Sequence, residues 1–175
     1  HLNRFIENCK SYVETACQVR SIDFHIELPE DGEEIHAQVD LDGLEKICFN
    51  FLANALKFTP DGGRITLGLS SHKGRARIYV DDDGPGISTD DQSKLFRLFA
   101  QVGDTAGTQG TGLGLALAKE LAEGMSGTVG VTSDLGQGST FYVDLNQTTE
   151  LASRDPQSVT SEMDLSGEYF LSDIS

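Results

Sequence analysis

The sequence has few basic residues, and this scarcity excludes a class of partners. Its 175 residues contain 13 Lys and Arg against 28 Asp and Glu, which gives a formal net charge of −15. A strongly acidic surface repels nucleic-acid backbones and anionic lipid headgroups. We therefore expect no nucleic-acid partner and no direct membrane contact. A bound phosphate group would have to be held by local geometry rather than by a basic surface.

Cysteines and long apolar runs are also scarce. Cys9, Cys17 and Cys48 are too few for a disulfide scaffold, and no CxxC spacing indicates a metal site. No apolar run reaches the length of a membrane span, and the first twenty residues lack a signal-peptide pattern. These absences predict a soluble domain in a reducing compartment. We expect a cytoplasmic location, either free or as the cytoplasmic part of a membrane-bound sensor.

The hydrophobic pattern predicts alternating helices and strands. Apolar residues spaced three and four apart predict helices over 2–19, 42–57, 90–99 and 113–125. Alternating apolar residues predict strands over 22–28, 65–69, 76–80, 129–131 and 141–145, of which the second and third form one hairpin and the last two another. This order predicts an α+β fold, a two-layer sandwich with helices packed on one face of a mixed, mostly antiparallel sheet.

Three segments carry residue types suited to ligand binding, and the first lies on the helix predicted over 42–57. Asn50, Asn54 and Lys57 are spaced i, i+4 and i+7, so they share one stripe of that helix. Amide oxygens suit a hard metal ion, and a lysine ammonium suits a phosphate. The alternative for this stripe alone is a solvated polar edge.

The second segment is Asp82-Asp83-Gly84-Pro85-Gly86, which follows the strand predicted over 76–80. A carboxylate at a strand end can accept a hydrogen bond from a ligand amino group. Gly84 and Gly86 would let the backbone approach a flat ring. The alternative for this segment alone is an acidic turn, because Asp-Gly turns are common.

The third segment is a glycine-rich loop over residues 107–115 that runs directly into a predicted helix. Backbone N–H groups at such a helix start bind phosphate without positive side chains, helped by the helix dipole. A phosphate ligand is thereby compatible with the charge of −15. We expect residues 101–111 to act as a lid whose order depends on the ligand.

Several common nucleotide-binding motifs are absent. Leu115 stands where the dinucleotide pattern needs its last glycine, and no Gly-Lys-Ser/Thr of a P-loop occurs. No Asp-Phe-Gly or His-Arg-Asp is present, which excludes a protein kinase of the eukaryotic type.

The order of the remaining motifs resembles the catalytic ATP-binding domain of sensor histidine kinases. An asparagine-rich helix, Asp-x-Gly-x-Gly, a Phe helix at 94–99 and Gly-x-Gly-x-Gly match the N, G1, F and G2 boxes of that family over roughly residues 23–145. The wider superfamily includes gyrase, MutL and certain heat-shock chaperones, and it implies the Bergerat-type ATP-binding fold. Asn54 to Pro60 and the closing Gly138-Ser139-Thr140-Phe141 are similar to the histidine-kinase branch in particular.

The resemblance implies a role for each matching residue, with ATP and Mg²⁺ as cofactors. Asp82 would accept from the adenine amino group, and Asn50 would hold Mg²⁺. Asn50 and Lys57 would be the catalytic residues. The remaining cofactor-binding positions would be Asn54 and Lys57 at the phosphates, Phe58 beside the nucleotide, Gly84 and Gly86 at the adenine, Gly110, Thr111, Gly112, Leu113 and Gly114 over the phosphates, and Thr140 behind the adenine in support of Asp82.

The resemblance also implies partners that are not encoded in this chain. No His-Glu-x-Arg-Thr/Ser-Pro acceptor motif occurs. The γ-phosphate would therefore pass to a histidine on a separate dimerisation domain, and then to a response regulator. We expect the isolated domain to be a monomer that does not autophosphorylate. The alternatives are a serine kinase of the anti-sigma type and a degenerate nucleotide-binding regulator. Lys46 stands near the position where gyrase-like ATPases carry a catalytic Glu, which argues against hydrolysis as the main activity.

Three regions follow from the motifs and the composition. Residues 1–20 would be a helix leading to the dimerisation domain, and residues 21–147 the catalytic ATP-binding domain. Residues 148–175 are rich in acidic residues, Ser and Thr without an apolar period, which predicts a flexible acidic tail or linker.

Overall fold

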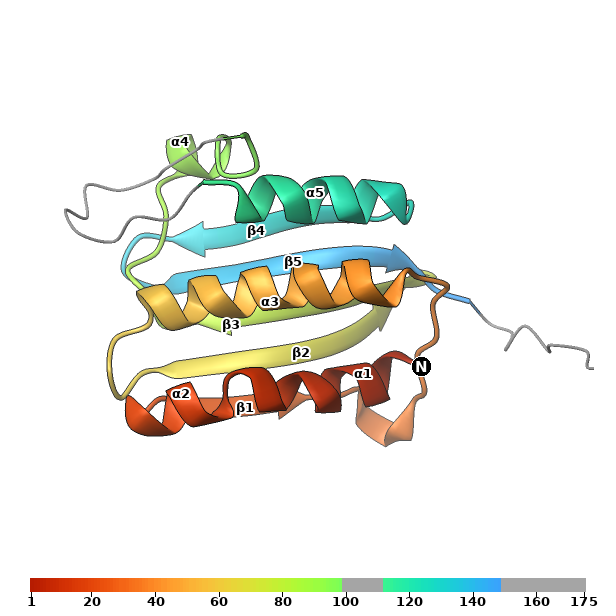
Figure 1. Cartoon of the computed structure of the whole chain (residues 1–175), viewed down its shortest axis with the longest axis horizontal. Coiled ribbons are helices and arrows are strands. Elements are labelled where there is room, and N and C mark those ends of the chain that lie inside the picture. Colours follow the sequence, from red (N-terminus) through yellow and green to blue (C-terminus); the bar gives the residue numbers. More distant parts are fainter. Residues whose placement is uncertain (99–111, 149–175) are drawn as a thin grey trace, which may run out of the picture.

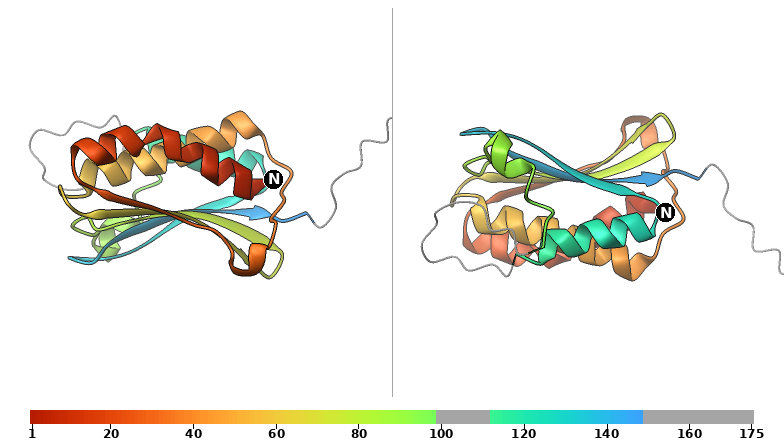
Figure 2. Two further views of the ribbon diagram at one scale, coloured as in Figure 1. Left: turned by 90° about the horizontal axis from the view of Figure 1, so that it is seen from below. Right: turned by 90° about the horizontal axis from the view of Figure 1, so that it is seen from above.

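The computed structural model describes residues 1–98 and 112–148, where a five-stranded sheet carries helices on one face (Figures 1 and 2). The strands are β1 (Asp23–Glu27), β2 (Arg64–His72), β3 (Arg75–Asp82), β4 (Thr128–Asp134) and β5 (Gly138–Asn146). The helices are α1 (Leu2–Cys9), α2 (Glu14–Val19), α3 (Leu41–Phe58), α4 (Thr89–Gln92) and α5 (Gly114–Gly124), with 3₁₀ turns at Lys10–Tyr12 and Glu30–Gly32. In this part of the chain, no helix has the length and apolar character needed to cross a bilayer.

The sheet is mixed, with the strand order β1-β2-β3-β5-β4. β1 pairs with β2 in parallel, and every other neighbouring pair is antiparallel. Lys73 and Gly74 turn the β2–β3 hairpin with φ of +49° and +74°, as a tight two-residue turn requires. The predicted two-layer α+β sandwich is therefore confirmed.

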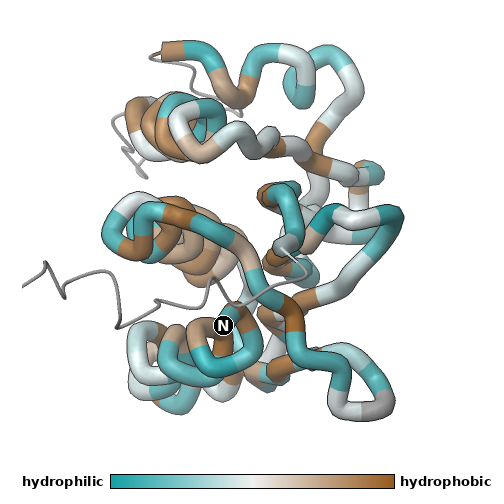
Figure 3. The backbone as a smooth tube through the Cα atoms, turned by 90° about the vertical axis from the view of Figure 1, so that its right-hand side faces the viewer, coloured by the Kyte–Doolittle hydropathy of each residue, from teal (hydrophilic) through white to brown (hydrophobic). Residues whose placement is uncertain are grey.

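One core lies between the helix layer and the sheet. Figure 3 shows these two layers end-on. β3 alternates in burial, so that its odd side chains Arg77 and Tyr79 lie on the open face while its even ones point to the helices. The residues from strands and helices that fill this core include Leu2, Ile6, Leu44, Ile47, Phe51, Leu52, Ile65, Leu67, Ile78, Val80, Ala118 and Val143. Because α1 supplies core residues too, residues 1–20 pack as part of this unit; their role as a connecting helix stays a prediction.

The opening segment differs from the continuous helix predicted over 2–19. α1 ends at Cys9, a 3₁₀ turn follows, and Val13 has φ −122° before α2 begins. The hydrophobic residues stay in register across this break, since Cys9, Val13 and Cys17 are all buried. Burial of one face, rather than continuous helix geometry, therefore produced the apolar pattern in the sequence.

The open face of the sheet carries two tyrosines that lie over glycines. A Cβ atom at Gly68 would overlap the ring of Tyr79, and one at Gly130 would overlap the ring of Tyr142. The Tyr79 hydroxyl donates to Glu27 Oε2 at 2.6 Å, so this side chain crosses β2 and reaches β1. Burial and the Glu27 carboxylate raise the pKa of Tyr79 far above its usual value.

Arg20, which follows α2, holds the end of α3. Its guanidinium donates to the carbonyl oxygens of Leu56 and Thr59 and to Asp61 Oδ1, the last two at 2.7 Å each. Carbonyls in the last turn of a helix have no partner within the helix, and the helix dipole favours a cation there. Arg20 therefore fixes the point at which α3 stops and the chain turns toward β2.

Replacing Arg20 should destabilise the domain. Arg20→Ala leaves the half-buried carbonyls at the end of α3 without their donor, so we expect the free energy of unfolding to fall by about 1–3 kcal/mol. Arg4→Ala is the matched control, because Arg4 is an exposed arginine of α1 whose side chain makes no hydrogen bond or ion pair with the described residues. Urea denaturation measures both, and equal stability of the two variants would contradict this role.

Candidate nucleotide-binding site

A buried carboxylate stands at the end of β3. Asp82 is only 5% exposed and lies between Ile65 of β2 and Ser139 of β5 in the sheet register. Its Oδ1 accepts the backbone N–H of Gly84 at 2.8 Å, and no other side-chain hydrogen bond to Asp82 is formed within the described residues. A carboxylate in this position has acceptor capacity left for a ligand donor.

The surroundings of Asp82 disfavour its charge. Burial raises the pKa of Asp82 to about 6, against the opposing effect of the Gly84 hydrogen bond, and the neighbouring charges of Asp81 and Asp83 raise it further. A carboxyl group whose pKa lies this far above its ordinary value, at the end of a strand, is typical of a binding or catalytic site.

The loop after Asp82 is fixed by the β4–β5 hairpin. Pro85 O accepts from the Gly136 N–H at 2.8 Å, and Ile87 N–H donates to Ser133 Oγ at 2.8 Å. Gly86 has φ +73°, and a Cβ there would overlap the carbonyl oxygen of Asp134. Only glycine fits this close approach of two backbones, which holds the Gly84–Gly86 loop in place beside Asp82.

Asn50 lies half-buried on α3 with its amide held in one orientation. Its Nδ2 donates to the carbonyl of Lys46 at 2.9 Å, so its Oδ1 remains as the acceptor on the other side. A Cβ at Gly114 would overlap this Oδ1, which places the amide oxygen directly against the first residue of α5. Figure 1 shows the two helices side by side over the sheet.

The other residues of the α3 stripe follow toward the end of the helix. Asn54 is half-buried one turn after Asn50, and Lys57 and Phe58 are exposed in the last turn. The Lys57 ammonium lies 5.1 Å from the centroid of the Phe58 ring. A Cβ at Gly84 would lie 3.4 Å from the Cβ of Phe58, so the end of α3 adjoins the loop after Asp82.

The glycine-rich segment is described only from Gly112 onward. Gly112 has φ +67°, and Leu113 precedes α5 as an exposed N-cap that supplies no side-chain hydrogen bond to the helix start. The first N–H groups of α5 thus have no side-chain cap. Gly110, Thr111 and the proposed lid over 101–111 lie outside the described residues.

The predicted support of Asp82 by Thr140, directly or through water, is wrong, because the two side chains lie on opposite faces of the sheet. Thr140 lies opposite Asp81 in the register, and its hydroxyl donates to Asp81 Oδ1 at 2.6 Å on the open face of the sheet. Ser139 is the residue opposite Asp82, and like Asp82 it is buried. The sequence could have shown this, because alternate residues of a strand face the same side and Ser139 alternates with the buried Phe141 and Val143.

Sequence reasoning also missed the residues that support the site. Gln92 Nε2 donates to the carbonyls of Ile87 and Ser133, at 2.8 and 2.7 Å, and so ties α4 to the loop after Asp82 and to β4. Ser133 Oγ donates to Gly138 O at 2.6 Å. No local pattern marks the contact between Gln92 and Ser133, because these residues lie 41 positions apart in the chain. The predicted Phe helix is wrong over the described residues: α4 covers only Thr89–Gln92, and residues 94–98 form turns. Phe96 packs on the ring of Phe141 with centroids 6.4 Å apart.

The sequence model of the histidine kinase-, DNA gyrase B- and HSP90-like ATPases matches residues 39–149. The chain belongs to this family. The matched range contains the described site from Asn50 on α3 to Ser139 on β5. It also contains the start of α5, which packs against Asn50.

Among the members of this family, the chain is similar to sensor histidine kinases. The sensor histidine kinase TmoS of Ectopseudomonas mendocina is 42% identical over 131 residues, which are 73% of this chain and 13% of TmoS. The crystal structure of full-length ShkA in complex with AMPPNP superposes with a TM-score of 0.75 at 30% identity, over 86% of this chain and 31% of that one. The catalytic domain of the histidine kinase ThkA has a TM-score of 0.72 at 26% identity, over 84% of this chain and 93% of that domain. The ATPase domain thus has the fold of histidine kinase catalytic domains, and the chain spans only a small part of full-length relatives such as TmoS.

The raised pKa of Asp82 predicts a pH-dependent stability cost. Its pKa lies above the ordinary 3.8 in the folded state, so the stability that the protonated carboxyl confers is complete below that value and is lost as pH rises through about 6. Asp82→Asn cannot ionise. The variant should therefore be more stable than the wild type by about 1–3 kcal/mol at pH 7.5, and this advantage should shrink toward pH 4. Urea titrations at both pH values measure it, and a pH-independent difference would contradict the assignment.

Gly114→Ala should disturb Asn50 without weakening the fold. The new Cβ would displace the Asn50 amide oxygen, so we expect Mg²⁺-dependent affinity for an ATP analogue to fall roughly tenfold, with a stability change below about 1 kcal/mol. Gly124→Ala is the matched control at the other end of α5, where a Cβ meets no atom within 4 Å. Calorimetric titration of both variants tests this, and equal affinities would remove Asn50 and Gly114 from the site.

Proposed function

We propose that this domain is the ATP-binding catalytic module of a sensor histidine kinase, which transfers the γ-phosphate of ATP to a histidine on a separate dimerisation domain. The observation that supports it most is the buried Asp82, with spare acceptor capacity, next to the α3 asparagine stripe and the start of α5. Family membership and the sensor histidine kinases among the relatives support the same function. A cytoplasmic location agrees with a domain that uses ATP.

The residues around Asp82 fit an adenine ring. Asp82 would accept the exocyclic amino group, which gives selectivity for adenine over a base with an oxygen at that position. Gly84 and Gly86 carry no side chain and would border the flat base; at Gly84 the backbone lies between Asp82 and Phe58. Phe58 would border the nucleotide from the end of α3.

The stripe on α3 fits a magnesium-bound triphosphate. Mg²⁺ prefers oxygen ligands, and the Lys46 hydrogen bond leaves the Asn50 Oδ1 as the acceptor beside α5. Asn54 and Lys57 would face the phosphates from the next two turns. A bound Mg²⁺ ion neutralises charge that builds on the phosphate oxygens during transfer. Gly110 to Gly114 would supply backbone N–H groups to the same oxygens.

The protein's part in transfer is to position the nucleotide and the metal ion. Asn50 orients the metal, Asp82 fixes the base at the other end of the nucleotide, and both are held by hydrogen bonds already formed in the protein. Lys46 pairs with Asp42 at 2.6 Å on the exposed side of α3, so it is not placed as a general base. We infer that the γ-phosphate goes to a protein acceptor rather than to water.

The partners follow from this function. The acceptor would be a histidine of the dimerisation domain of the same kinase, and a response regulator would take the phosphoryl group from it. A solved structure of ThkA in complex with the response regulator protein TrrA has the same fold, with a TM-score of 0.68 at 21% identity. We propose that the isolated domain is monomeric.

Phosphoryl transfer to a supplied dimerisation domain tests the function. The domain, γ-labelled ATP and Mg²⁺ should label a dimerisation domain with its acceptor histidine, and the label should be acid-labile and base-stable as a phosphohistidine is. The domain alone should acquire no stable label. Asn50→Ala should lose most of the transfer, because the metal is no longer oriented. Asp82→Asn should bind ATP about 1–3 kcal/mol more weakly.

Other outcomes point to the other candidates. Acid-stable label on a serine-bearing partner would indicate a serine kinase of the anti-sigma type. ATP binding without transfer to any dimerisation domain tested would indicate a nucleotide-binding regulator. Normal transfer by Asn50→Ala across a magnesium titration would contradict the metal assignment. The role of Asp82 in ATP binding is tested separately, by the ATP affinity of Asp82→Asn.

A further inference from the structure

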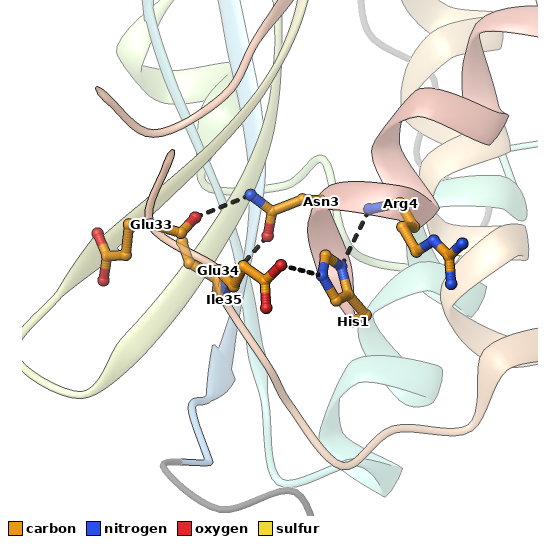
Figure 4. A network of polar contacts seen from close by, with 6 residues as sticks. All are labelled: His1, Asn3, Arg4, Glu33, Glu34 and Ile35. Carbon is orange, nitrogen blue, oxygen red and sulfur yellow. Dashed lines mark hydrogen bonds and ion pairs between the residues drawn. The ribbon is translucent and has the colours of Figure 1, made fainter. Parts of the chain in front are cut away.

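Two histidines and a glutamate meet at the end of the domain opposite to the nucleotide site, where residue 1 lies in Figure 1. His1 Nε2 lies 3.3 Å from Glu34 Oε1, as Figure 4 shows, and the rings of His1 and His36 meet edge to face with centroids 4.8 Å apart. One ligand atom from each of His1, Glu34 and His36 lies within 4.8 Å of the others. We propose that these three side chains bind Zn²⁺.

The donor set selects a borderline transition metal over the magnesium of the nucleotide site. Imidazole nitrogen suits Zn²⁺, Ni²⁺ and Cu²⁺, whereas Mg²⁺ takes oxygen ligands. In a tetrahedral zinc site with bonds of roughly 2.0–2.1 Å, ligand atoms stand about 3.3 Å apart. The His1–Glu34 pair already has this spacing at 3.3 Å. His36 completes the set by a side-chain rotation, and water would occupy the fourth position.

Hydrogen bonds hold the start of α1 against residues 33–36 independently of any ion. Leu2 N–H donates to Ile35 O at 2.9 Å. Asn3 donates from Nδ2 to Glu33 O and accepts the Ile35 N–H at Oδ1, both at 2.9 Å (Figure 4). These bonds fix the start of α1 against residues 33–36, so the site needs little reorganisation to form.

The side chains of residues 34–36 alternate, so that Glu34 and His36 point outward. Ile35 is fully buried in the core, so its two neighbours Glu34 and His36 point away from the core on the same side. The carbonyl of His36 accepts the Thr148 N–H at 2.8 Å, which holds the segment from the end of β5. Glu34 and His36 are therefore carried by a backbone segment that is fixed by hydrogen bonds, and His1 is held through Leu2 and Asn3.

The hydrogen bonding of His1 gives the site a distinctive signature. His1 Nδ1 accepts the backbone N–H of Arg4 at 3.3 Å, so a neutral His1 carries its proton on Nε2, toward Glu34. Zn²⁺ binds the lone pair of Nε2, so the Nε2 proton leaves to solvent and Nδ1 takes up a proton to keep the ring neutral. The Arg4 N–H loses its acceptor, so zinc binding should change the amide environment at the start of α1.

Calorimetric titration of Zn²⁺ into the chain, with excess Mg²⁺ present, tests the site. We expect one zinc ion per chain and a rise in the midpoint of thermal unfolding, since the ion binds the folded state. His36→Asn and Glu34→Gln should each weaken binding about tenfold or more. His25→Asn is the matched control, because His25 also pairs with a carboxylate, Asp23 Oδ2 at 2.7 Å, but lacks a second histidine. Its affinity should equal that of the wild type.

A second measurement reports on zinc at His1 Nε2 directly. The Arg4 amide signal should shift on zinc addition in a ¹⁵N–¹H spectrum, because the Arg4 N–H loses its acceptor. Equal affinities of the wild type, His36→Asn and Glu34→Gln would overturn the proposal, as would an unchanged Arg4 signal. Nucleotide affinity and circular dichroism, unchanged in each variant, show that the fold is intact.

Discussion

The packing of α3 against the sheet is the constraint on which the other features of the domain depend. The helix buries one full face in the core, from Leu44 to Ala55, and this fixes its rotation about its own axis. Because the rotation is fixed, Asn50 and Asn54 cannot face anywhere but the edge of that buried face, where α5 begins. The same hydrophobic contacts that stabilise the fold therefore also orient the polar residues of the candidate site.

A strongly acidic chain can offer a site for a phosphorylated ligand because the electrostatics of the site are local. Asp82 is kept from water and next to two further carboxylates, so its negative charge is costly until a donor arrives. The anionic end of the nucleotide would instead meet amide groups and the start of α5, about two turns away along α3. Because the surroundings of Asp82 and the start of α5 are separate, one site could bind both the amino group of the base and the anionic phosphates.

Hydrophobic periodicity was enough to predict the five strands, α3, α5 and the two-layer arrangement, because burial of one face leaves a repeat that the sequence shows directly. It misled at 2–19, where a 3₁₀ turn keeps the same residues buried without continuing the helix. The motif order singled out Asp82 and Asn50, and their roles stay predictions. The error at Thr140 was one of strand parity, and the contacts of Arg20 and Gln92 were beyond reach since each joins segments that are distant in the sequence.

The side chain of Tyr79 acts as a strap across three strands, from its own place on β3, over Gly68 of β2, to Glu27 of β1. β1 is an edge strand and joins the sheet only through β2, and α1 and α2 lie on the same side of the domain (Figure 1). Any side chain at Gly68 would displace the Tyr79 ring, and the hydrogen bond from Tyr79 to Glu27 of β1 would be lost. Asp82 and the loop behind it, held by β5 and the β4–β5 hairpin, would keep their geometry. One glycine on the bare face therefore sets how closely the Tyr79 side chain can tie β1 to β2 and β3.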